Sequence, residues 1–321
     1  MADSGLDRQM LAQVRRIQVR TDRMVTDVMA GGYSSVFRGS GIEFDEVREF
    51  AEGDDLRSID WNVTARAGRP FVKKFTEERE LTVLLLLDVS ASTSFVTRPP
   101  DRADSRTVAA TMALFCGCIA FAAAKNQDKV GLVTFATGKP NWVPAKKGRA
   151  HALRVIRDAV ATERVGTGSA LGEAVDFVAR VQRKKAVVFV ISDFFGETPE
   201  RQLRLLAQRH DTIAVRVRDP FEGGIDPRVR TSASDPDPVP RLPRAGLQRV
   251  RDLETGQYQW RDTDHAPTRE ALWRAVVDER TRLREFCQRA GIDLLDVPTF
   301  GSVADPIVRF FQMREKRGGR R

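Results

Sequence analysis

The amino-acid sequence predicts an α/β fold, in which a mostly parallel sheet is covered by helices on both faces. The prediction depends on three apolar runs, which are residues 81–87 (LTVLLLL), 129–136 (KVGLVTFA) and 186–192 (AVVFVIS). Near-continuous apolar runs of this kind are typical of strands that are buried on both sides. Segments with helical periodicity separate them, and strands that alternate with helices favour a parallel sheet.

The remaining elements are predicted from their own patterns. Thr198 and Pro199 suit an N-cap followed by proline at the first helical position, and Asp305 with Pro306 suits the start of a last helix. Periodicity and short apolar runs predict helices at 105–125, 149–160, 171–182, 198–210 and 269–290, and further strands at 212–217 and 292–297.

The pattern divides the chain into an N-terminal extension and one larger domain. Residues 1–80 predict an amphipathic helix followed by a small, partly β extension, which glycines interrupt. Residues 81–315 predict the α/β domain, with an insertion at 219–265 that consists of a proline-rich loop and a β-hairpin at 246–262. Residues 316–321 form a basic tail.

The composition limits the classes of function. The formal net charge is +9 and the isoelectric point is near 9.9. The excess charge is spread thinly, and the sequence shows neither a zinc finger nor a ribonucleoprotein motif nor a basic patch interleaved with aromatic residues. We therefore expect no specific nucleic-acid binding. Three cysteines without metal or disulfide spacing predict buried thiols.

The longest uncharged apolar segment, residues 108–124, contains Thr111 and Gly117 and predicts a buried helix. No apolar stretch is expected to be long enough for a membrane span. The N-terminus lacks the hydrophobic region of a signal peptide. These features predict a cytoplasmic protein.

Oxygen-bearing side chains follow two of the apolar runs. Asp88 comes directly after residues 81–87, and Ser90 and Ser92 follow at a spacing of two, while Asp193 comes after residues 186–192. Because sites in open α/β sheets form outside the carboxyl ends of strands, we expect these side chains to converge. Carboxylate and hydroxyl oxygens suit a hard cation such as Mg²⁺, with Mn²⁺ or Ca²⁺ as further possibilities.

A loop hydroxyl is expected to complete this metal site. The segment GTGSALGEAV offers Thr167 and Ser169, and the spacing leaves both open. The ordered set of DxSxS, a Thr/Ser-Gly loop and a strand ending in Ser-Asp resembles the metal-ion-dependent adhesion site of von Willebrand factor A domains.

A second resemblance concerns the segment before the first apolar run. This segment has the form GDD-R-IDW---AR, and with DLETGQYQW and GIDLLDVPT it resembles the signature of the bacterial family called domain of unknown function 58 (DUF58). The resemblance covers most of residues 30–315. The residues of the segment are Gly53, Asp54, Asp55, Arg57, Ile59, Asp60, Trp61, Ala65 and Arg66.

The DUF58 resemblance implies a von Willebrand factor A-like fold, and it implies metal ligation by Asp88, Ser90, Ser92 and Asp193. In the register of the family, Ser169 stands where threonine is usual, and Thr167 would need a slip of two residues. The family is associated with MoxR-type AAA+ ATPases in the assembly or maturation of other proteins. The resemblance thus implies a non-enzymatic protein-binding module, whose partner donates a carboxylate to the metal.

An acidic block at residues 43–60 has two interpretations. It could form a second cation site or a docking face for basic partners. We favour the other interpretation, in which Asp54, Asp55 and Asp60 fix turns and pair with nearby arginines. Trp61 is expected to be a packed anchor rather than a recognition residue.

Two other functions are compatible with the sequence. The first is a Mg²⁺-dependent phosphotransfer enzyme with Asp88 as the nucleophile. Against it, Ser90 stands where such enzymes place a second aspartate, and no general base is well placed. The second is salt-sensitive binding of nucleic acid through the basic surface.

Overall fold

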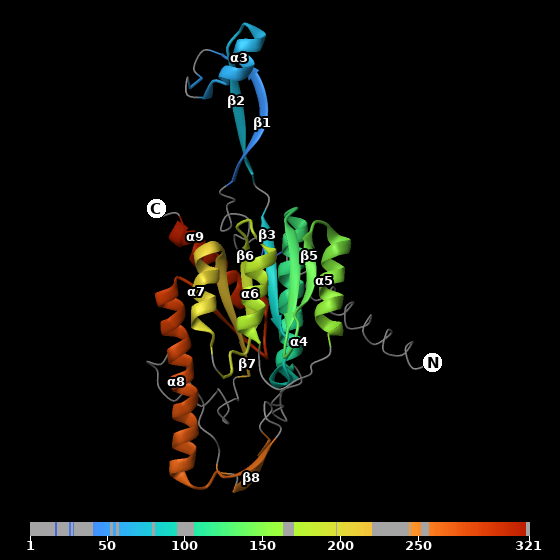
Figure 1. The fold of residues 1–321 in the computed structure, drawn as a ribbon. Coiled ribbons are helices and arrows are strands. Elements are labelled where there is room, and N and C mark those ends of the chain that lie inside the picture. The colour runs from blue at the N-terminus through green and yellow to red at the C-terminus, as the bar shows by residue number, and fades with distance from the viewer. Residues whose placement is uncertain are drawn as a thin grey trace, which may run out of the picture. The chain divides into compact units, whose positions relative to one another are not determined.

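A computed structural model describes residues 41–51, 54–55, 58–78, 81–94, 106–162, 170–196, 198–219, 244, 246–251 and 257–318, together with positions 17, 26 and 28 (Figure 1). The chain divides into two compact units. Phe37–Leu81 forms the smaller unit, and Met1–Val36 with Thr82–Arg321 forms the larger one. The smaller unit thus begins later than the extension predicted at 1–80.

The larger unit alternates strands and helices along most of its length. Its strands are β3 (Thr82–Asp88), β4 (Lys129–Phe135), β5 (Asn141–Lys146), β6 (Val187–Ser192), β7 (Asp211–Arg218), β8 (Leu247–Arg251), β9 (Tyr258–Asp262) and β10 (Asp293–Pro298). Its helices are the short 3₁₀ helix η2 (Ala91–Ser94), α4 (Val108–Lys125), α5 (Arg149–Ala161), α6 (Leu171–Val181), α7 (Glu200–Arg209), α8 (Ala266–Ala290) and α9 (Ala304–Gly318).

Six of these strands form the central sheet, in the order β10-β7-β6-β3-β4-β5. All neighbours are parallel except β4 and β5, which are antiparallel. Numbered along the chain within this sheet, the order from β5 to β10 reads 3-2-1-4-5-6. The predicted fold class, a mostly parallel α/β sheet, is confirmed.

Helices cover both faces of the sheet. Leu84 and Leu86 of β3 belong to a buried cluster with residues of α6, α7 and α8. The alternate residues Leu85 and Leu87 point to the opposite face, because successive side chains of a strand alternate. On that face α4 packs against β3, β4 and β7, and α5 packs against α4 and β4. This two-sided burial explains why β3 is apolar from Val83 to Leu87.

Helix α4 is the apolar segment predicted to be buried. It is long and apolar enough to cross a membrane by length and composition, but most of its residues lie in the core. The expectation that no segment reaches this length is therefore wrong, whereas the prediction of a buried helix is confirmed.

Three details of the predicted elements are wrong. Strand β5 was not predicted, since only Val143 among its residues is buried and Pro144 interrupts the pattern. Pro199 is the N-cap of α7 rather than its first helical residue. Helix α9 begins at Ala304, and the backbone N–H of Asp305 donates to Ser302 Oγ, so Asp305 is not the cap.

The three cysteines are free and buried, as predicted. Burial raises the pKa of Cys118 to about 12 and that of Cys287 to about 11. Because the thiolate is the reactive form, these thiols are unsuited to nucleophilic chemistry.

The smaller unit consists of strands β1 (Gly41–Glu49) and β2 (Phe71–Glu78) and the helix α3 (Trp61–Ala67). The strands pair antiparallel. Asp60 Oδ1 accepts hydrogen bonds from the backbone N–H groups of Asn62 and Val63, which caps α3.

Charged residues of the acidic block have structural partners in this unit. Arg48 donates to both carboxylate oxygens of Asp54, at 2.6 and 2.8 Å. Asp54 also accepts a hydrogen bond from the backbone of Ala51, and these contacts hold the pKa of Asp54 below its usual value. These contacts agree with the interpretation that Asp54 and Asp60 fix turns. Trp61, by contrast, is 70% exposed, so the expectation of a packed anchor is wrong.

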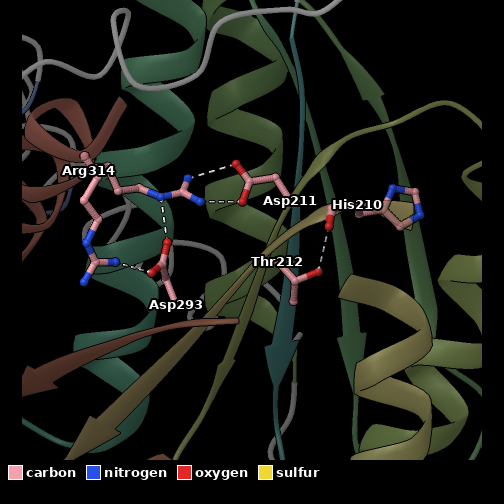
Figure 2. A network of polar contacts seen from close by, with 6 residues as sticks. His210, Asp211, Thr212, Asp293 and Arg314 are labelled. Carbon is pink, nitrogen blue, oxygen red and sulfur yellow. Dashed lines mark hydrogen bonds and ion pairs between the residues drawn. The ribbon is translucent and has the colours of Figure 1, made fainter. Parts of the chain in front are cut away.

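An ion-pair network joins the beginnings of two sheet strands to α9 (Figure 2). The guanidinium of Arg314 donates to both oxygens of Asp211, at 2.6 and 2.9 Å, and to Asp293 at 2.8 Å. Arg317 adds a longer contact to Asp293. Asp211 and Asp293 are the first residues of β7 and β10, at the edge opposite the carboxyl ends of the strands. The network therefore stabilises the docking of α9.

Candidate functional site

The candidate site begins where β3 ends. Asp88 is the last residue of the strand and is fully buried. Its Oδ1 accepts a hydrogen bond from the backbone N–H of Ser90 at 2.8 Å, so the chain turns around the carboxylate. Each carboxylate oxygen has two lone pairs, which leaves acceptor capacity beyond this bond.

The turn places two hydroxyl groups beside each other. Ser90 Oγ and Ser92 Oγ lie 3.0 Å apart, and either can be the donor. Thr93 holds the backbone here, since its hydroxyl donates to the carbonyl of Ser90 at 2.7 Å. Ser90 is buried and Ser92 is half-buried, so the pair lies between the core and the surface.

The end of β6 meets the end of β3 at this point. Ser192 is the last residue of β6, and its hydroxyl donates to Asp88 Oδ2 at 2.7 Å. Asp193 follows directly and is half-buried. One hydrogen bond thus joins two chain segments that are 104 residues apart in sequence, and it places both aspartates at the same edge of the sheet.

The loop after β6 is held in an unusual conformation. Phe194 has a positive φ of 54°, which is uncommon for a residue with a side chain. Its backbone N–H donates to Ser192 Oγ, and that of Phe195 donates to Asp193 Oδ1. Phe194 is buried, whereas Phe195 is 58% exposed at the rim of the site.

Helix α8 supports the same loop from outside. The backbone N–H of Gly196 donates to Glu279 Oε1 at 3.0 Å. Burial raises the pKa of Glu279, although this hydrogen bond and nearby arginines oppose the rise.

The structure brings together four of the six predicted metal ligands, which are Asp88, Ser90, Ser92 and Asp193. Thr167 and Ser169 lie outside the described residues. Ser192 and Glu279 were not predicted. Ser192 could have been found from the strand pattern, because it ends a buried run that carries an oxygen. Glu279 has no sequence signal, since only the fold brings α8 to the loop.

The place of the site in the sheet agrees with a general rule. In doubly wound sheets, ligands bind outside the carboxyl ends of the strands where the strand order reverses direction. Here the reversal lies between β3 and β6, which are the strands that end in Asp88 and Ser192.

The donor set fits a small divalent cation of the magnesium type. Oxygens at about 2.1 Å from an octahedral Mg²⁺ lie about 3.0 Å apart when they are neighbours. The serine hydroxyls have this separation. Within the described part of the chain, no group of three or more His, Cys, Asp or Glu side chains is placed to hold a metal. A cation here would therefore depend on hydroxyls and water beside the two carboxylates.

Comparison with known families identifies the chain. The family described as "Protein of unknown function DUF58" matches residues 46–282. The chain belongs to the DUF58 family. Curated relatives include the uncharacterized protein Rv1480 of Mycobacterium tuberculosis, which is 28% identical over 97% of this chain and 91% of its own length. The uncharacterized protein MAV169 of Mycobacterium avium is 28% identical over 54% of this chain and 94% of its own length.

Solved structures similar to this DUF58 protein share little sequence with it. BatB from Bacteroides thetaiotaomicron, a conserved hypothetical protein, is 14% identical with a TM-score of 0.43, over 74% of this chain and 99% of its own. The SpRpn10 VWA domain is 12% identical with a TM-score of 0.36, over 72% of this chain and 95% of its own.

Proposed function

We propose that this DUF58 protein is a non-enzymatic protein-binding module with a metal-ion-dependent adhesion site. Ser90 and Ser92 would ligate a divalent cation, of which Mg²⁺ fits best, and Asp88 and Asp193 would balance its charge. A cation held in this way would offer an open coordination position to a carboxylate of a partner protein.

The observation that carries the proposal is the convergence at the ends of β3 and β6. The hydrogen bond from Ser192 to Asp88 closes one side of the site, and the hydroxyls of Ser90 and Ser92 lie 3.0 Å apart. Burial decreases from Asp88 through Ser92 to Phe195, so the site opens toward the surface. An open, hydroxyl-rich site of this kind suits capture of an external oxygen ligand.

We propose a MoxR-type AAA+ ATPase as a partner in the assembly or maturation of other proteins. This part of the proposal is supported by membership of the DUF58 family and by the implications of that resemblance.

The phosphotransfer alternative finds less support in the geometry. A nucleophilic carboxylate must approach a phosphoryl group with one oxygen. The side chain of Asp88 is fully buried, and both of its oxygens accept hydrogen bonds. We expect no Asp88-dependent hydrolysis of generic aryl phosphates.

The test is capture of partners from native lysate by the full chain, with Mg²⁺ and with EDTA. We expect bands that depend on Mg²⁺ and are lost with Ser92→Ala. Ser94→Ala is the matched control, because Ser94 lies on the same short helix but is exposed. Asp88→Ala should also lose the bands, although it leaves buried donors unpaired. Capture that is indifferent to EDTA and to Ser92→Ala would refute the proposal.

A further inference from the structure

His210 is a buried histidine at the junction between α7 and β7. The residue is 4% exposed, and within the described part of the chain neither of its ring nitrogens has a hydrogen-bond partner. A neutral imidazole carries one N–H donor and one acceptor nitrogen, and burial of such groups without partners costs free energy. The ring therefore gives up its hydrogen bonds to water when the core forms.

The backbone around His210 is fixed on both sides of the junction. Its N–H donates to the carbonyl of Leu206 in α7 at 2.9 Å, and its carbonyl accepts a longer bond from Thr212 Oγ1 at 3.4 Å. The N–H of the next residue, Asp211, donates to the carbonyl of Ala186 at 2.9 Å, directly before β6. Water can therefore reach the ring only when this junction, or an element packed on it, moves.

The side chains of His210 and Asp211 point to opposite faces of the sheet. The backbone of His210 is extended, and successive side chains alternate in an extended chain. The ring shares its face with Ala214, which belongs to the buried cluster under α6, α7 and α8. Figure 2 shows the ring directed away from the ion pairs that join Asp211 to Arg314 of α9. The two neighbouring residues thus connect the core on one face to α9 on the other.

The surroundings of the ring disfavour a charge on it. Burial is the largest cause that lowers the pKa of His210, and the charge of Arg209 lowers it further. On the opposite face, Asp211 and Asp293 are engaged by Arg314. Other charged side chains at the ends of the elements packed here are exposed, and all but Glu285 are cations: Arg180, Arg183, Lys184, Lys185, Glu285 and Arg289.

From these contacts we infer that His210 is an acid-sensitive latch, which holds the α7–β7 junction closed while its ring is neutral. A proton added to the ring favours states in which the junction opens and the imidazolium reaches water. Opening displaces Asp211, whose carboxylate accepts two hydrogen bonds from Arg314. Mild acid therefore releases α9 from the beginning of β7.

The direction of the pH effect follows from proton binding. In the closed state the lowered pKa keeps the ring of His210 neutral, whereas in the open state the ring regains the ordinary pKa of about 6.5. The open state therefore binds more protons below about pH 6.5, and the closed state loses stability as the pH falls. Ordinary carboxylates titrate near pH 4, so a change between pH 7.5 and 5.5 reports on histidine.

The test is hydrogen exchange of the full chain, measured by mass spectrometry at pH 7.5 and 5.5 and corrected for the intrinsic exchange rate. We expect the α9 amides to be less protected than those of β3, and their protection to fall about threefold to tenfold between the two pH values. His210→Leu removes both ring nitrogens, so its α9 protection should not change with pH. His265→Leu is the control, because His265 is exposed, and should keep the wild-type fall.

An NMR titration of the imidazole signals gives a second measurement that needs no variant to fold. The signal of His210 should titrate below the ordinary histidine value of about 6.5. Three results would overturn the inference. They are an equal fall of α9 protection in wild type and His210→Leu, protection of α9 equal to that of β3, and a His210 signal that titrates at or above about pH 6.5.

Discussion

At the scale of single residues, Ser192 makes two buried hydrogen bonds in the candidate site. Its hydroxyl donates to Asp88 Oδ2 at 2.7 Å and accepts from the backbone N–H of Phe194 at 3.0 Å. Both bonds are buried. One small side chain thus orients the carboxylate and the loop that follows β6.

Replacement of Ser192 by alanine removes both bonds and leaves a buried carboxylate oxygen with one donor fewer. We expect the free energy of unfolding to fall by about 1–3 kcal/mol. Urea denaturation at neutral pH measures the change. Unaltered stability of Ser192→Ala would show that the bond to Asp88 is not formed in solution.

Trp61 and Trp142 allow a matched comparison of exposure. Trp61 is exposed on α3, whereas Trp142 is half-buried with its ring 6.2 Å from that of Phe177. We expect Trp61→Ala to change stability by less than about 0.5 kcal/mol and Trp142→Ala to cost about 3 kcal/mol. Calorimetric melting compares the two, and an equal loss for both would mean that Trp61 is packed.

Asp296 predicts a pH dependence of stability. Burial alone raises the pKa of Asp296, but the hydrogen bond and charge of Arg216 outweigh burial and hold that pKa below its usual value of 3.8. A lowered folded-state pKa gives stability that is present above the unfolded pKa and is lost as pH falls through the folded pKa. Wild type should therefore lose more stability below about pH 4 than Asp296→Asn does.

The Asp296→Asn variant starts from a lower stability at neutral pH, by about 1.5–3 kcal/mol, because it removes the charge of the carboxylate to which Arg216 donates a hydrogen bond. Unfolding in urea at a series of pH values separates the lower stability of the variant at neutral pH from its smaller loss of stability on acidification. If both proteins lost the same stability on acidification, folding would not lower the pKa of Asp296.

At the scale of elements, a hydrogen bond connects α8 to the loop of the candidate site. Glu279 Oε1 accepts from the backbone N–H of Gly196, three residues after Asp193. Phe194 needs a positive φ, so the loop depends on neighbours to keep its shape. We therefore expect Glu279 to act as a positioning residue for Asp193.

We expect Glu279→Ala to weaken Mg²⁺ binding about threefold to tenfold, the equivalent of one lost hydrogen bond. Glu285→Ala is the control, since Glu285 lies on the same helix and pairs only weakly at the surface with Arg289. Titration calorimetry of both variants provides the measurement. Equal Mg²⁺ affinity of Glu279→Ala and wild type would exclude the positioning role.

The elements that the sequence predicted well are those with a clear hydrophobic pattern. Strands β3 and β6 are apolar over Val83–Leu87 and Val187–Ile191 because both of their faces are covered. Strand β5 has one buried residue and a proline, so no periodicity marks it. The cap of α7 was misplaced by one residue, because proline suits either position on steric grounds. Trp61 was misjudged since composition favours burial of an indole, whereas a small unit offers little core.

The features of the candidate site also divide into those that the sequence predicts and those that it does not. Asp88, Ser90, Ser92 and Asp193 could be predicted, because a parallel sheet brings the carboxyl ends of its strands to one edge. The bond from Ser192 to Asp88 and the support from Glu279 could not, since they join residues 104 and 83 positions apart. Such contacts follow from side-chain packing, which no local pattern encodes.

At the scale of the whole molecule, the order of strands determines where chemistry can occur. The strand order reverses direction between β3 and β6, and the oxygen-bearing side chains lie at the ends of these two strands. At the opposite edge, Asp211 and Asp293 pair with Arg314 and Arg317 of α9 (Figure 2). The two edges therefore differ in structure, since one carries the carboxylates and hydroxyls of the candidate site and the other is held by ion pairs.

The central claim is that the hydroxyls of Ser90 and Ser92, with Asp88 and Asp193, bind a divalent cation. Titration calorimetry of the full chain with Mg²⁺ tests it most directly, with Ser92→Ala as the variant and Ser94→Ala as its control. The account predicts one binding site in wild type, the same affinity in Ser94→Ala, and affinity at least about tenfold weaker in Ser92→Ala. Absence of binding in wild type, or equal affinity in all three proteins, would contradict it.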